Sequence, residues 1–397
     1  MQYRKMGSLD WEVSALGFGC MRLPSRRFSL MGADLKESKR IIRYGIDRGI
    51  NYIDTAWPYH LGESEKVVGE TLKDGYRDKV KLVTKLPMFM VHRTGDFDRF
   101  LNVQLERLQT DHIDIYLFHA LNAGSFQRVK QLGLIKKMEE AQRQGRILQI
   151  GFSFHDTFPV FKEIIDYYEW DMAQIQYNYM DTCLQATTEG LEYAHEKGIA
   201  VVIMEPVKGG TLANPPREAA EIIANAPVKR TPVDWALQFL WNKPEVATVL
   251  SGMSDMQQVV ENCDSADRSG IDSLSQEEDQ VISRLAEIYQ NKILVPCTGC
   301  EYCMPCPHGV NIPQNFAIIN NVSLEKSRIR RFQVRRAYRK LASGPPRLDL
   351  DNPNGKASVC INCGLCVENC PQDINIPVEL EKVEAVMGRG ESIENHF

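Results

Sequence analysis

Short β-rich segments alternate with amphipathic helical segments through the first 290 residues, and this alternation limits the folds open to the chain. Each crossover takes about thirty residues, which is typical of parallel βα units. Eight such units close into a barrel, whereas a doubly wound open sheet is the alternative. No glycine-rich dinucleotide turn follows the first strand, so we expect an α/β barrel of the (β/α)8 type. The strand candidates are Val13–Cys20, Ile50–Ala56, Val80–Lys85, Ile113–His119, Ile147–Phe154, Met172–Tyr177, Ile199–Met204 and Val246–Ser251.

Helical patterns fill the intervals between these strands. The opening stretch LDWEVSALGFG also allows a short hairpin across the bottom of the barrel. A capped helix is predicted over Ser275–Gln290, and the composition changes beyond it. We therefore expect a barrel domain over residues 1–290 and a smaller, mostly helical domain over residues 291–397. The helical patterns include Leu35–Asp47, Ser64–Leu72, Phe97–Leu108, Phe126–Gln144, Leu184–Glu196 and Val233–Trp241.

Composition excludes several classes of protein. The chain has 397 residues, of which 43% are hydrophobic and 25% charged, as is ordinary for a soluble globular protein. Its net charge of −5 argues against a nucleic-acid partner. The N-terminus does not resemble a signal peptide, and no apolar run reaches the ~18–20 residues of a membrane-spanning helix. We therefore expect a cytoplasmic protein with no membrane partner.

Polar residues stand where the strand candidates end, and in a barrel these ends converge on one face. Asp54 ends the second strand, Lys85 the third and His119 the fourth. Lys85 follows an apolar run, and a buried lysine needs a partner, for which Asp54 is the obvious candidate. The other polar residues at strand ends are Ser153, Gln176, Glu205 and the pair Ser251-Gly252.

Tyr59 follows Asp54 by five residues, on the loop that leaves the second strand. A carboxylate and a phenol held this close suit a site in which the phenol exchanges a proton. Tyrosine titrates near pH ~10 in water, so such a site must lower that pKa with positive charge nearby. The alternative is a strand end with a capping aspartate and a packed tyrosine. Polar residues at so many strand ends favour the active site.

The constellation Asp54, Tyr59, Lys85 and His119 resembles the catalytic tetrad of the aldo-keto reductases, over roughly residues 1–290. The stretch DTAWPYHLGESE, the tripeptide VTK and the strand IDIYLFHA carry the resemblance. It implies an NAD(P)-linked enzyme that interconverts a small carbonyl and an alcohol by hydride transfer. Tyr59 is then the general acid or base, Lys85 with Asp54 lowers its pKa, and His119 orients the carbonyl.

The resemblance also implies a nucleotide site, with departures from the family pattern. The asparagine usual after the fifth strand is absent, which leaves Ser153 and Gln176 to hold the nicotinamide carboxamide. Met204 stands where the family commonly stacks a tyrosine on the nicotinamide ring. No basic residue lies near Gln258 to grip a 2′-phosphate, so NADP and NAD both stay open. The expected cofactor contacts are Met21, Ser153, Gln176, Met204, Glu205, Gly252, Gln258, Glu261 and Asn262.

Eight of the eleven cysteines fall in two C-terminal clusters, which indicates metal binding and not disulfides in a cytoplasmic chain. Each cluster repeats a cysteine at every third position and ends in Cys-Pro, after two intervening residues in the first motif and three in the second. Zinc also uses such pairs, but this repeat, present twice, favours two [4Fe–4S] clusters. The expected ligands are Cys297, Cys300, Cys303, Cys306, Cys360, Cys363, Cys366 and Cys370.

The C-terminal region resembles a bacterial-type two-cluster ferredoxin domain in its helical version. In such domains the fourth cysteine of each motif ligates the other cluster. The resemblance therefore implies one cluster on Cys297, Cys300, Cys303 and Cys370, and the other on Cys306, Cys360, Cys363 and Cys366. The spacer between the motifs carries eight basic residues over Lys326–Lys340. We interpret them as compensation for cluster charge or as a docking site for an acidic electron carrier, in preference to nucleic-acid binding.

A nicotinamide moves two electrons as hydride, whereas a [4Fe–4S] cluster moves one electron at a time. Exchange between them usually needs a flavin; no flavin motif is recognisable, and a bound flavin stays possible. The leading hypothesis is an aldo-keto reductase that carries two clusters. One alternative is an electron-transfer protein whose barrel binds a redox cofactor and whose clusters pass electrons to a partner. In another alternative, the clusters serve only structure or oxygen sensing.

Overall fold

The chain folds into two compact units in the computed structural model. The first comprises Met1–Pro206 with Val233–Gln276, and the second comprises Val207–Pro232 with Glu277–Phe397. Within the described residues, no helix is both long and apolar enough to cross a membrane. The structure describes residues 1–25, 32–324, 334–336, 338–341 and 355–397.

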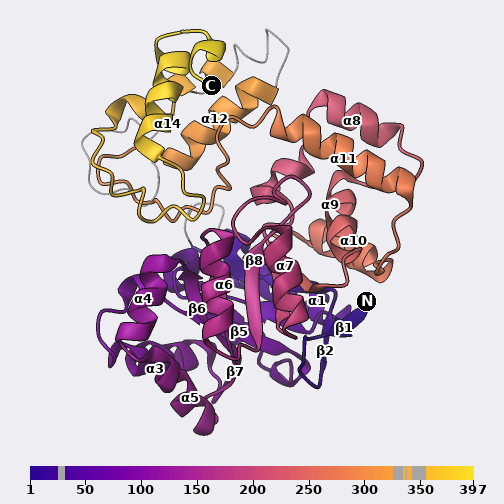
Figure 1. Cartoon of the computed structure of the whole chain (residues 1–397), viewed down its shortest axis with the longest axis vertical. Coiled ribbons are helices and arrows are strands. Elements are labelled where there is room, and N and C mark those ends of the chain that lie inside the picture. The colour runs from indigo at the N-terminus through magenta and orange to yellow at the C-terminus, as the bar shows by residue number, and fades with distance from the viewer. Residues whose placement is uncertain (26–31, 325–333, 337, 342–354) are drawn as a thin grey trace. The chain divides into compact units, whose positions relative to one another are not determined.

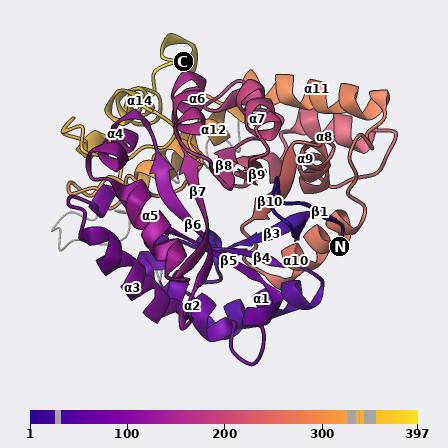
Figure 2. The ribbon, with the colours of Figure 1, turned by 60° about the horizontal axis from the view of Figure 1, so that its bottom comes forward.

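The first unit contains a closed barrel of eight parallel strands, as the alternation predicts (Figure 1). The strands are β3 (Leu16–Gly19), β4 (Tyr52–Asp54), β5 (Lys81–Leu86), β6 (Ile113–Leu121), β7 (Ile147–Phe154), β8 (Met172–Gln176), β9 (Ala200–Met204) and β10 (Val246–Ser251). Strands consecutive in the chain are neighbours in the ring, and β10 pairs with both β9 and β3 to close it. Figure 2 shows the strands gathered at the centre of this unit with helices outside them.

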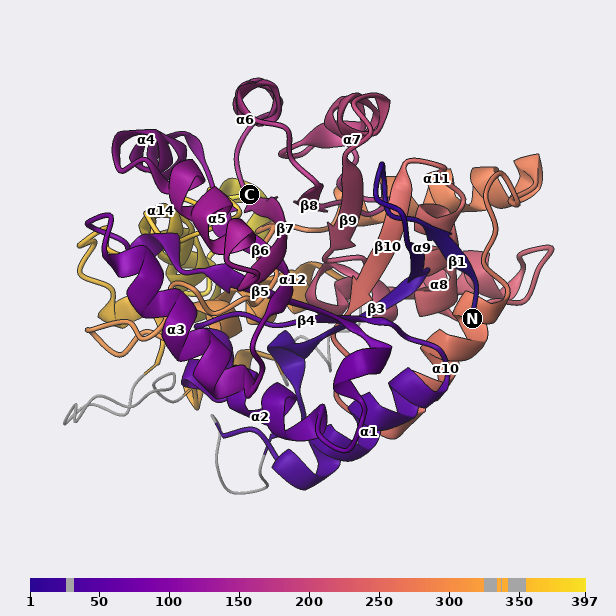
Figure 3. The same ribbon diagram turned by 90° about the horizontal axis from the view of Figure 1, so that it is seen from below.

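Two apolar layers stabilise the barrel, because successive side chains of a strand point to opposite faces. In β6, Tyr116 and Phe118 face the outer helices, whereas Ile115 and Leu117 belong to a separate cluster inside the ring. The helices of this unit surround the strands, as the view from below shows (Figure 3). They are α1 (Leu35–Asp47), α2 (Ser64–Thr71), α3 (Asp96–Leu108), α4 (Ala123–Gln131), α5 (Leu134–Arg143), α6 (Phe158–Tyr167), α7 (Thr187–Glu196), α9 (Pro232–Trp241) and α10 (Met256–Asp267).

Two predicted elements are divided in the structure. Within the strand expected over Val13–Cys20, β2 (Glu12–Ser14) pairs antiparallel with β1 (Tyr3–Lys5), and only β3 enters the barrel. The hairpin that the opening stretch allows is therefore present. The helix expected over Phe126–Gln144 is two helices, α4 and α5, because the chain turns at Gly133 with a φ of 63°.

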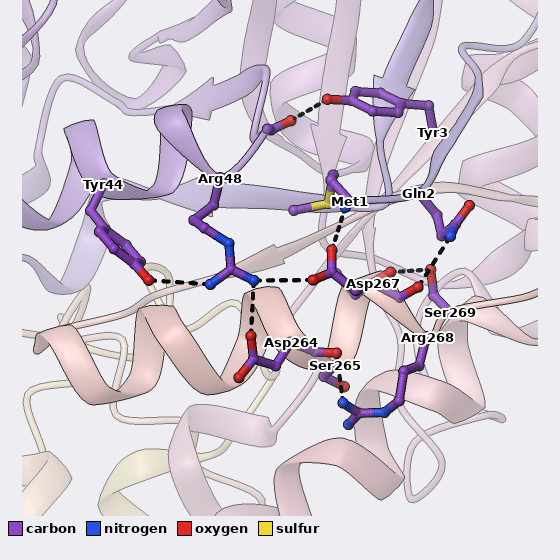
Figure 4. A network of polar contacts seen from close by, with 12 residues as sticks. Met1, Gln2, Tyr3, Tyr44, Arg48, Asp264, Ser265, Asp267, Arg268 and Ser269 are labelled. Carbon is purple, nitrogen blue, oxygen red and sulfur yellow. Dashed lines mark hydrogen bonds and ion pairs between the residues drawn. The ribbon is translucent and has the colours of Figure 1, made fainter.

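Ion pairs near the N-terminus link the first and last βα units of the barrel (Figure 4). Arg48, which follows α1, donates to Asp264 at 2.8 Å and to Asp267 at 3.0 Å, both on α10. The N-terminal ammonium of Met1 also pairs with Asp267. Partly exposed pairs of this kind each contribute only ~0–1 kcal/mol. Closure of the barrel therefore depends mainly on the β3–β10 ladder and the apolar layers.

The second unit is mostly helical and has an apolar core of its own, which confirms the predicted fold class. Its core includes Val310, Phe316, Ile319, Leu380 and Val383, and six of the clustered cysteines pack against it. Its helices are α8 (Arg217–Ala224), α11 (Gln276–Gln290), α12 (Ile312–Leu324) and α14 (Ile376–Val383). Of the basic stretch over residues 326–340, positions 326–333 and 337 lie outside the described residues.

Gly151 of β7 lies where the neighbouring strands leave no room for a side chain. An added Cβ would be 2.4 Å from the Met172 carbonyl oxygen of β8 and 2.9 Å from Leu117 Cδ2 of β6. We expect Gly151→Ala to lower the free energy of unfolding of the barrel by about 1–3 kcal/mol, the usual cost of overpacking. All five tryptophans lie in the first unit, so urea denaturation followed by tryptophan fluorescence measures this change.

Gly95→Ala is the matched control. Its φ of −67° is ordinary, and an added Cβ meets nothing within 4 Å. Stability should stay constant or rise slightly in this variant. An equal loss in both variants would contradict the packing argument.

Candidate active site and metal centres

The four residues predicted as a catalytic tetrad come from three neighbouring strand ends. Asp54 is the last residue of β4, Lys85 is the penultimate residue of β5, and His119 lies near the end of β6. Tyr59 begins the 3-10 turn Tyr59–Gly62, which follows β4. The carboxyl ends of parallel barrel strands open on one face, and all four side chains are buried there.

Lys85 and Asp54 form a buried ion pair. Lys85 Nζ donates to Asp54 Oδ2 at 2.6 Å and to the Thr55 carbonyl at 2.9 Å. The two side chains are only 1% and 4% exposed. Burial raises the pKa of Asp54, and the Lys85 ammonium opposes that shift. Loss of either partner would leave an uncompensated buried charge, which typically costs about 3–5 kcal/mol.

The Tyr59 ring lies close to both this ion pair and His119. Lys85 Nζ is 5.3 Å from the centroid of the Tyr59 ring, within the range of a cation–π interaction. The centroids of the Tyr59 and His119 rings are 6.2 Å apart, and the rings meet edge to face. A positive charge at this range, in a buried site, favours the phenolate form of a tyrosine.

His119 is held in its neutral form. Burial lowers its pKa well below the ordinary value, and the charges of Lys85 and His155 lower it further. A neutral imidazole carries one N–H donor, so His119 can donate a hydrogen bond to an oxygen placed beside it. The structure thus brings together a phenol, a cation and a neutral imidazole.

Ser153 and Met204, two predicted nucleotide contacts, lie at the ends of β7 and β9. Both already have polar contacts within the barrel. Ser153 Oγ accepts a hydrogen bond from the Ala120 backbone N–H at 2.8 Å. Met204 Sδ accepts from Gln174 Nε2 at 3.8 Å, so its side chain lies against the strand next to it.

A buried polar network continues from the end of β8. Gln176 Nε2 donates to Asp181 Oδ2 at 3.2 Å, and Asn178 Nδ2 donates to the same oxygen at 3.2 Å. Asn178 Nδ2 also lies 3.2 Å from the Glu205 carbonyl, just beyond β9. The sequence analysis did not single out Asn178 or Asp181. The polar positions in the stretch QYNYMD, which begins at Gln176, could have indicated them.

Arg22 connects three strand ends and was also missed. It ends the 3-10 turn Cys20–Arg22 after β3, next to the predicted contact Met21. Its guanidinium is 4.0 Å from the Glu205 carboxylate. Its Cβ lies 3.4 Å from the position of a Cβ added to Gly252, so Arg22 packs beside the turn after β10. The available sequence signal was a basic residue two positions past Cys20, the predicted end of the first strand.

The predicted nucleotide contacts on α10 face different ways. Asn262 is buried and donates to Ser251 Oγ at 3.0 Å, at the end of β10. Gln258 and Glu261 are exposed. Gln258 Oε1 accepts from the Ser254 backbone N–H at 2.9 Å. The structure therefore places Asn262 at the strand end and the other two residues on the surface of the helix.

Two cavities in the second unit are lined by the clustered cysteines. The larger measures about 260 Å³ and the smaller about 20 Å³. The larger is lined by Cys303, Cys306, Cys360, Cys363 and Cys366. The smaller is lined by Cys297, Cys300, Cys303 and Cys370. Each cavity therefore includes three cysteines of one motif and the last cysteine of the other.

The thiols crowd one another within these cavities. Burial, together with the neighbouring thiols of Cys306, Cys360 and Cys363, raises the pKa of Cys366 to about 11. Four thiolates in one place need compensating positive charge, which a [4Fe–4S] cluster supplies with one iron for each thiolate. Within the described residues, no three His, Cys, Asp or Glu side chains are placed to hold a single metal ion. Each cavity includes at least four cysteine thiols, the number that a [4Fe–4S] cluster uses, one for each iron.

Comparison with known proteins assigns both parts of the chain. Residues 15–278 match the model of the Aldo/keto reductase family, and residues 296–376 match that of a 4Fe-4S dicluster domain. The first match covers more than half of the chain. The protein therefore belongs to the aldo-keto reductase family of oxidoreductases and carries a C-terminal 4Fe–4S domain, as the resemblances predict.

Individual relatives match the barrel at moderate identity. An uncharacterized oxidoreductase of Bacillus subtilis, YqkF, is 28% identical over 67% of this chain and 91% of its own. L-galactose dehydrogenase of Arabidopsis thaliana is 26% identical over 66% of this chain and 87% of its own. Among solved structures, the holo form of aldo-keto reductase AKR11C1 from Bacillus halodurans matches with a TM-score of 0.60 at 28% identity, covering 72% of this chain and 96% of that one.

The neutral state of His119 predicts how stability depends on pH. In the unfolded chain a histidine takes a proton near pH ~6.5, whereas folded His119 resists protonation. The contribution of His119 to stability is therefore fully present above pH ~6.5 and is lost as the pH falls below it, by up to ~1.4 kcal/mol per pH unit. We expect His119→Gln to remove this part of the slope between pH 6.5 and 5 in urea denaturation of the barrel. Phe118→Leu, at the neighbouring position on β6, is the control and should lower stability equally at both pH values. If stability depended on pH in His119→Gln as it does in the unaltered chain, the neutral state of His119 would be contradicted.

Proposed function

We propose that the barrel interconverts a small carbonyl compound and its alcohol, with hydride supplied or taken up by a bound nicotinamide nucleotide. The observation that supports this most directly is the buried Lys85–Asp54 pair, with Lys85 Nζ 5.3 Å from the Tyr59 ring centroid. The desolvation cost of a buried ion pair can exceed its Coulombic gain, so the pair is weak evidence for a stabilising role. Next to a phenol at the open end of a barrel, it has a chemical use.

Each residue of the tetrad then has a defined part in carbonyl reduction. Tyr59 gives its phenolic proton to the carbonyl oxygen as hydride reaches the carbon. The ammonium of Lys85 stabilises the phenolate that remains, and Asp54 holds Lys85 in place. Neutral His119 donates a hydrogen bond to the same oxygen and orients it. In alcohol oxidation, the proton returns from the alcohol to the Tyr59 phenolate.

We further propose that the nucleotide binds along the ends of β7 to β10. Met21, Ser153, Gln176, Met204, Glu205, Gly252, Gln258, Glu261 and Asn262 would provide its contacts. The exposed Glu261 carboxylate and the engaged Gln258 amide offer nothing that attracts a 2′-phosphate, which supports NADH over NADPH. A relative from Escherichia coli, 29% identical over 41% of this chain, is named an NADH-specific methylglyoxal reductase.

The second unit is proposed to hold two [4Fe–4S] clusters. The cavity linings support the crossed ligand sets, one with Cys297, Cys300, Cys303 and Cys370, the other with Cys306, Cys360, Cys363 and Cys366. Bound clusters would supply one-electron chemistry. The chain's own contribution is to hold the thiols around a cavity in an apolar core.

A second candidate function is electron transfer to a protein partner. Arg335, Arg336, Arg339 and Lys340 are exposed in the second unit. Tyr338, between them in the chain, is buried and donates to Glu384, which anchors the cationic stretch on the core. An acidic electron carrier is the partner that such a charge would steer toward the protein.

Replacement of Tyr59 tests the enzymatic proposal. We expect Tyr59→Phe to lower kcat for NADH-dependent reduction of small aldehydes by about 10²–10⁴-fold, since it removes the general acid. The affinity for NADH should change little. Tyr76→Phe, on a half-buried tyrosine whose hydroxyl contacts Asp47, is the control and should retain full activity. Full carbonyl reduction by Tyr59→Phe would exclude Tyr59 as the acid.

Cysteine replacements test the number and ligand sets of the clusters. We expect about eight irons per chain in anaerobically prepared protein, and about four after either Cys300→Ala or Cys363→Ala, because each variant loses one cluster. Cys183→Ala, at an exposed cysteine outside both motifs, should keep all of the iron. Four irons in the unaltered protein would contradict the two-cluster proposal.

Anaerobic addition of NADH to the unaltered protein and the cysteine variants distinguishes electron transfer by the clusters from a structural or sensing role. Bleaching of the iron–sulfur absorbance indicates electron exchange with the nucleotide. An unchanged spectrum with bound NADH favours a structural or sensing role.

A further inference from the structure

The segment that follows β9 is part of the cluster-bearing unit. Tyr289 on α11 donates from its hydroxyl to the Leu212 carbonyl at 3.5 Å, in a buried contact. Arg230 donates to Glu278 at 2.7 Å. Helices α8 and α11 run side by side (Figures 1 and 2). A stretch that leaves the barrel at a strand end is thus packed against the region that leads into the first cysteine motif.

Gly209 makes the closest approach within this packing. It has a φ of +63°, and an added Cβ would lie 2.1 Å from the Thr298 carbonyl oxygen and 2.9 Å from its carbonyl carbon. No side chain fits at that distance. Thr298 is buried and lies between Cys297 and Cys300, two ligands proposed for one cluster. The turn at Gly209 therefore rests directly on the backbone of a cluster-binding loop.

The other end of the same segment is fixed at the proposed nucleotide site. The Glu205 carbonyl accepts from Asn178 Nδ2 at 3.2 Å, and the Glu205 carboxylate is 4.0 Å from Arg22. Only residues 206–208 separate Glu205 from Gly209. Even fully extended, a chain of this length spans only about 14 Å between the two Cα atoms. The turn at Gly209 and Glu205 are therefore joined by a short tether.

We propose that Gly209 is a positioning residue that couples metal binding at Cys297 and Cys300 to nucleotide binding at Met204 and Glu205. When the cluster-binding loop is ordered by its metal, Thr298 holds the turn at Gly209, and the end of β9 is held with it. Without the metal, that support is lost and the nucleotide must order the segment itself, at a cost in affinity. Coupling between two sites is reciprocal, so bound nucleotide also stabilises the loaded loop. This inference rests on the nucleotide site proposed above.

The test is a double-mutant cycle on the full chain, read by the dissociation constant for NADH from quenching of tryptophan fluorescence. Cys300→Ala should weaken NADH binding by about fivefold or more, the lower end of typical couplings between sites. Gly209→Ala should weaken it similarly, and the double variant should be no weaker than either one. Gly210→Ala is the control, since its φ of +97° is also left-handed but an added Cβ meets nothing within 4 Å; it should bind NADH as the unaltered chain does.

Two results would overturn the coupling. One is an NADH affinity that does not change in Cys300→Ala, and the other is an equal loss in Gly209→Ala and Gly210→Ala. If Cys300→Ala fails to fold, the rate at which the unaltered chain releases iron to a chelator tests the coupling instead. Saturating NADH should slow that release in the unaltered chain and in Gly210→Ala, but not in Gly209→Ala, and an absence of protection in all three rejects the proposal. Failure of the proposed function would be seen separately, as an absence of NADH binding by the unaltered chain.

Discussion

A lysine ammonium buried at the end of a barrel strand is the constraint on which the active site depends. Lys85 is 1% exposed, so its charge must be compensated within the barrel, and the Asp54 carboxylate at 2.6 Å provides this. The pair fixes the end of β4 against the end of β5 and leaves a cation beside the Tyr59 ring. The same cation helps to keep His119 neutral. Burial is the larger cause of the lowered His119 pKa, and the Lys85 charge adds to it.

Much of this architecture could be predicted, because periodicity and strand-end chemistry are local properties. The alternation of segments indicated all eight barrel strands, and a polar residue after each apolar run indicated which face they share. The cysteine spacing was similarly informative, since three thiols at three-residue intervals have few uses other than a cluster. Predictions failed at boundaries, as at Gly133, where the chain turns inside a continuous helical pattern.

The site residues that could not be predicted from the sequence owe their positions to contacts between distant parts of the chain. Arg22 gains its position from Glu205 and Gly252, which lie about two hundred positions later. Asn178 and Asp181 stand in an ordinary-looking loop, and only the fold shows that they form a buried network with Gln176. The contact between Gly209 and Thr298 likewise has no local signal. A glycine pair in a loop predicts a turn, but not what the turn touches.

The second unit is assembled from two stretches of chain, with β10 and α10 of the barrel encoded between them. This order has a consequence for synthesis on the ribosome. Residues 207–232 emerge early, yet their packing partners in 277–397 appear only after the last barrel strand has been made. At ~5–20 residues per second, synthesis of the 45 residues from 232 to 277 takes roughly 2–9 seconds. During it, the apolar face of α8 has no partner from its own unit, so the nascent chain passes through a stage in which chaperones have a surface to bind.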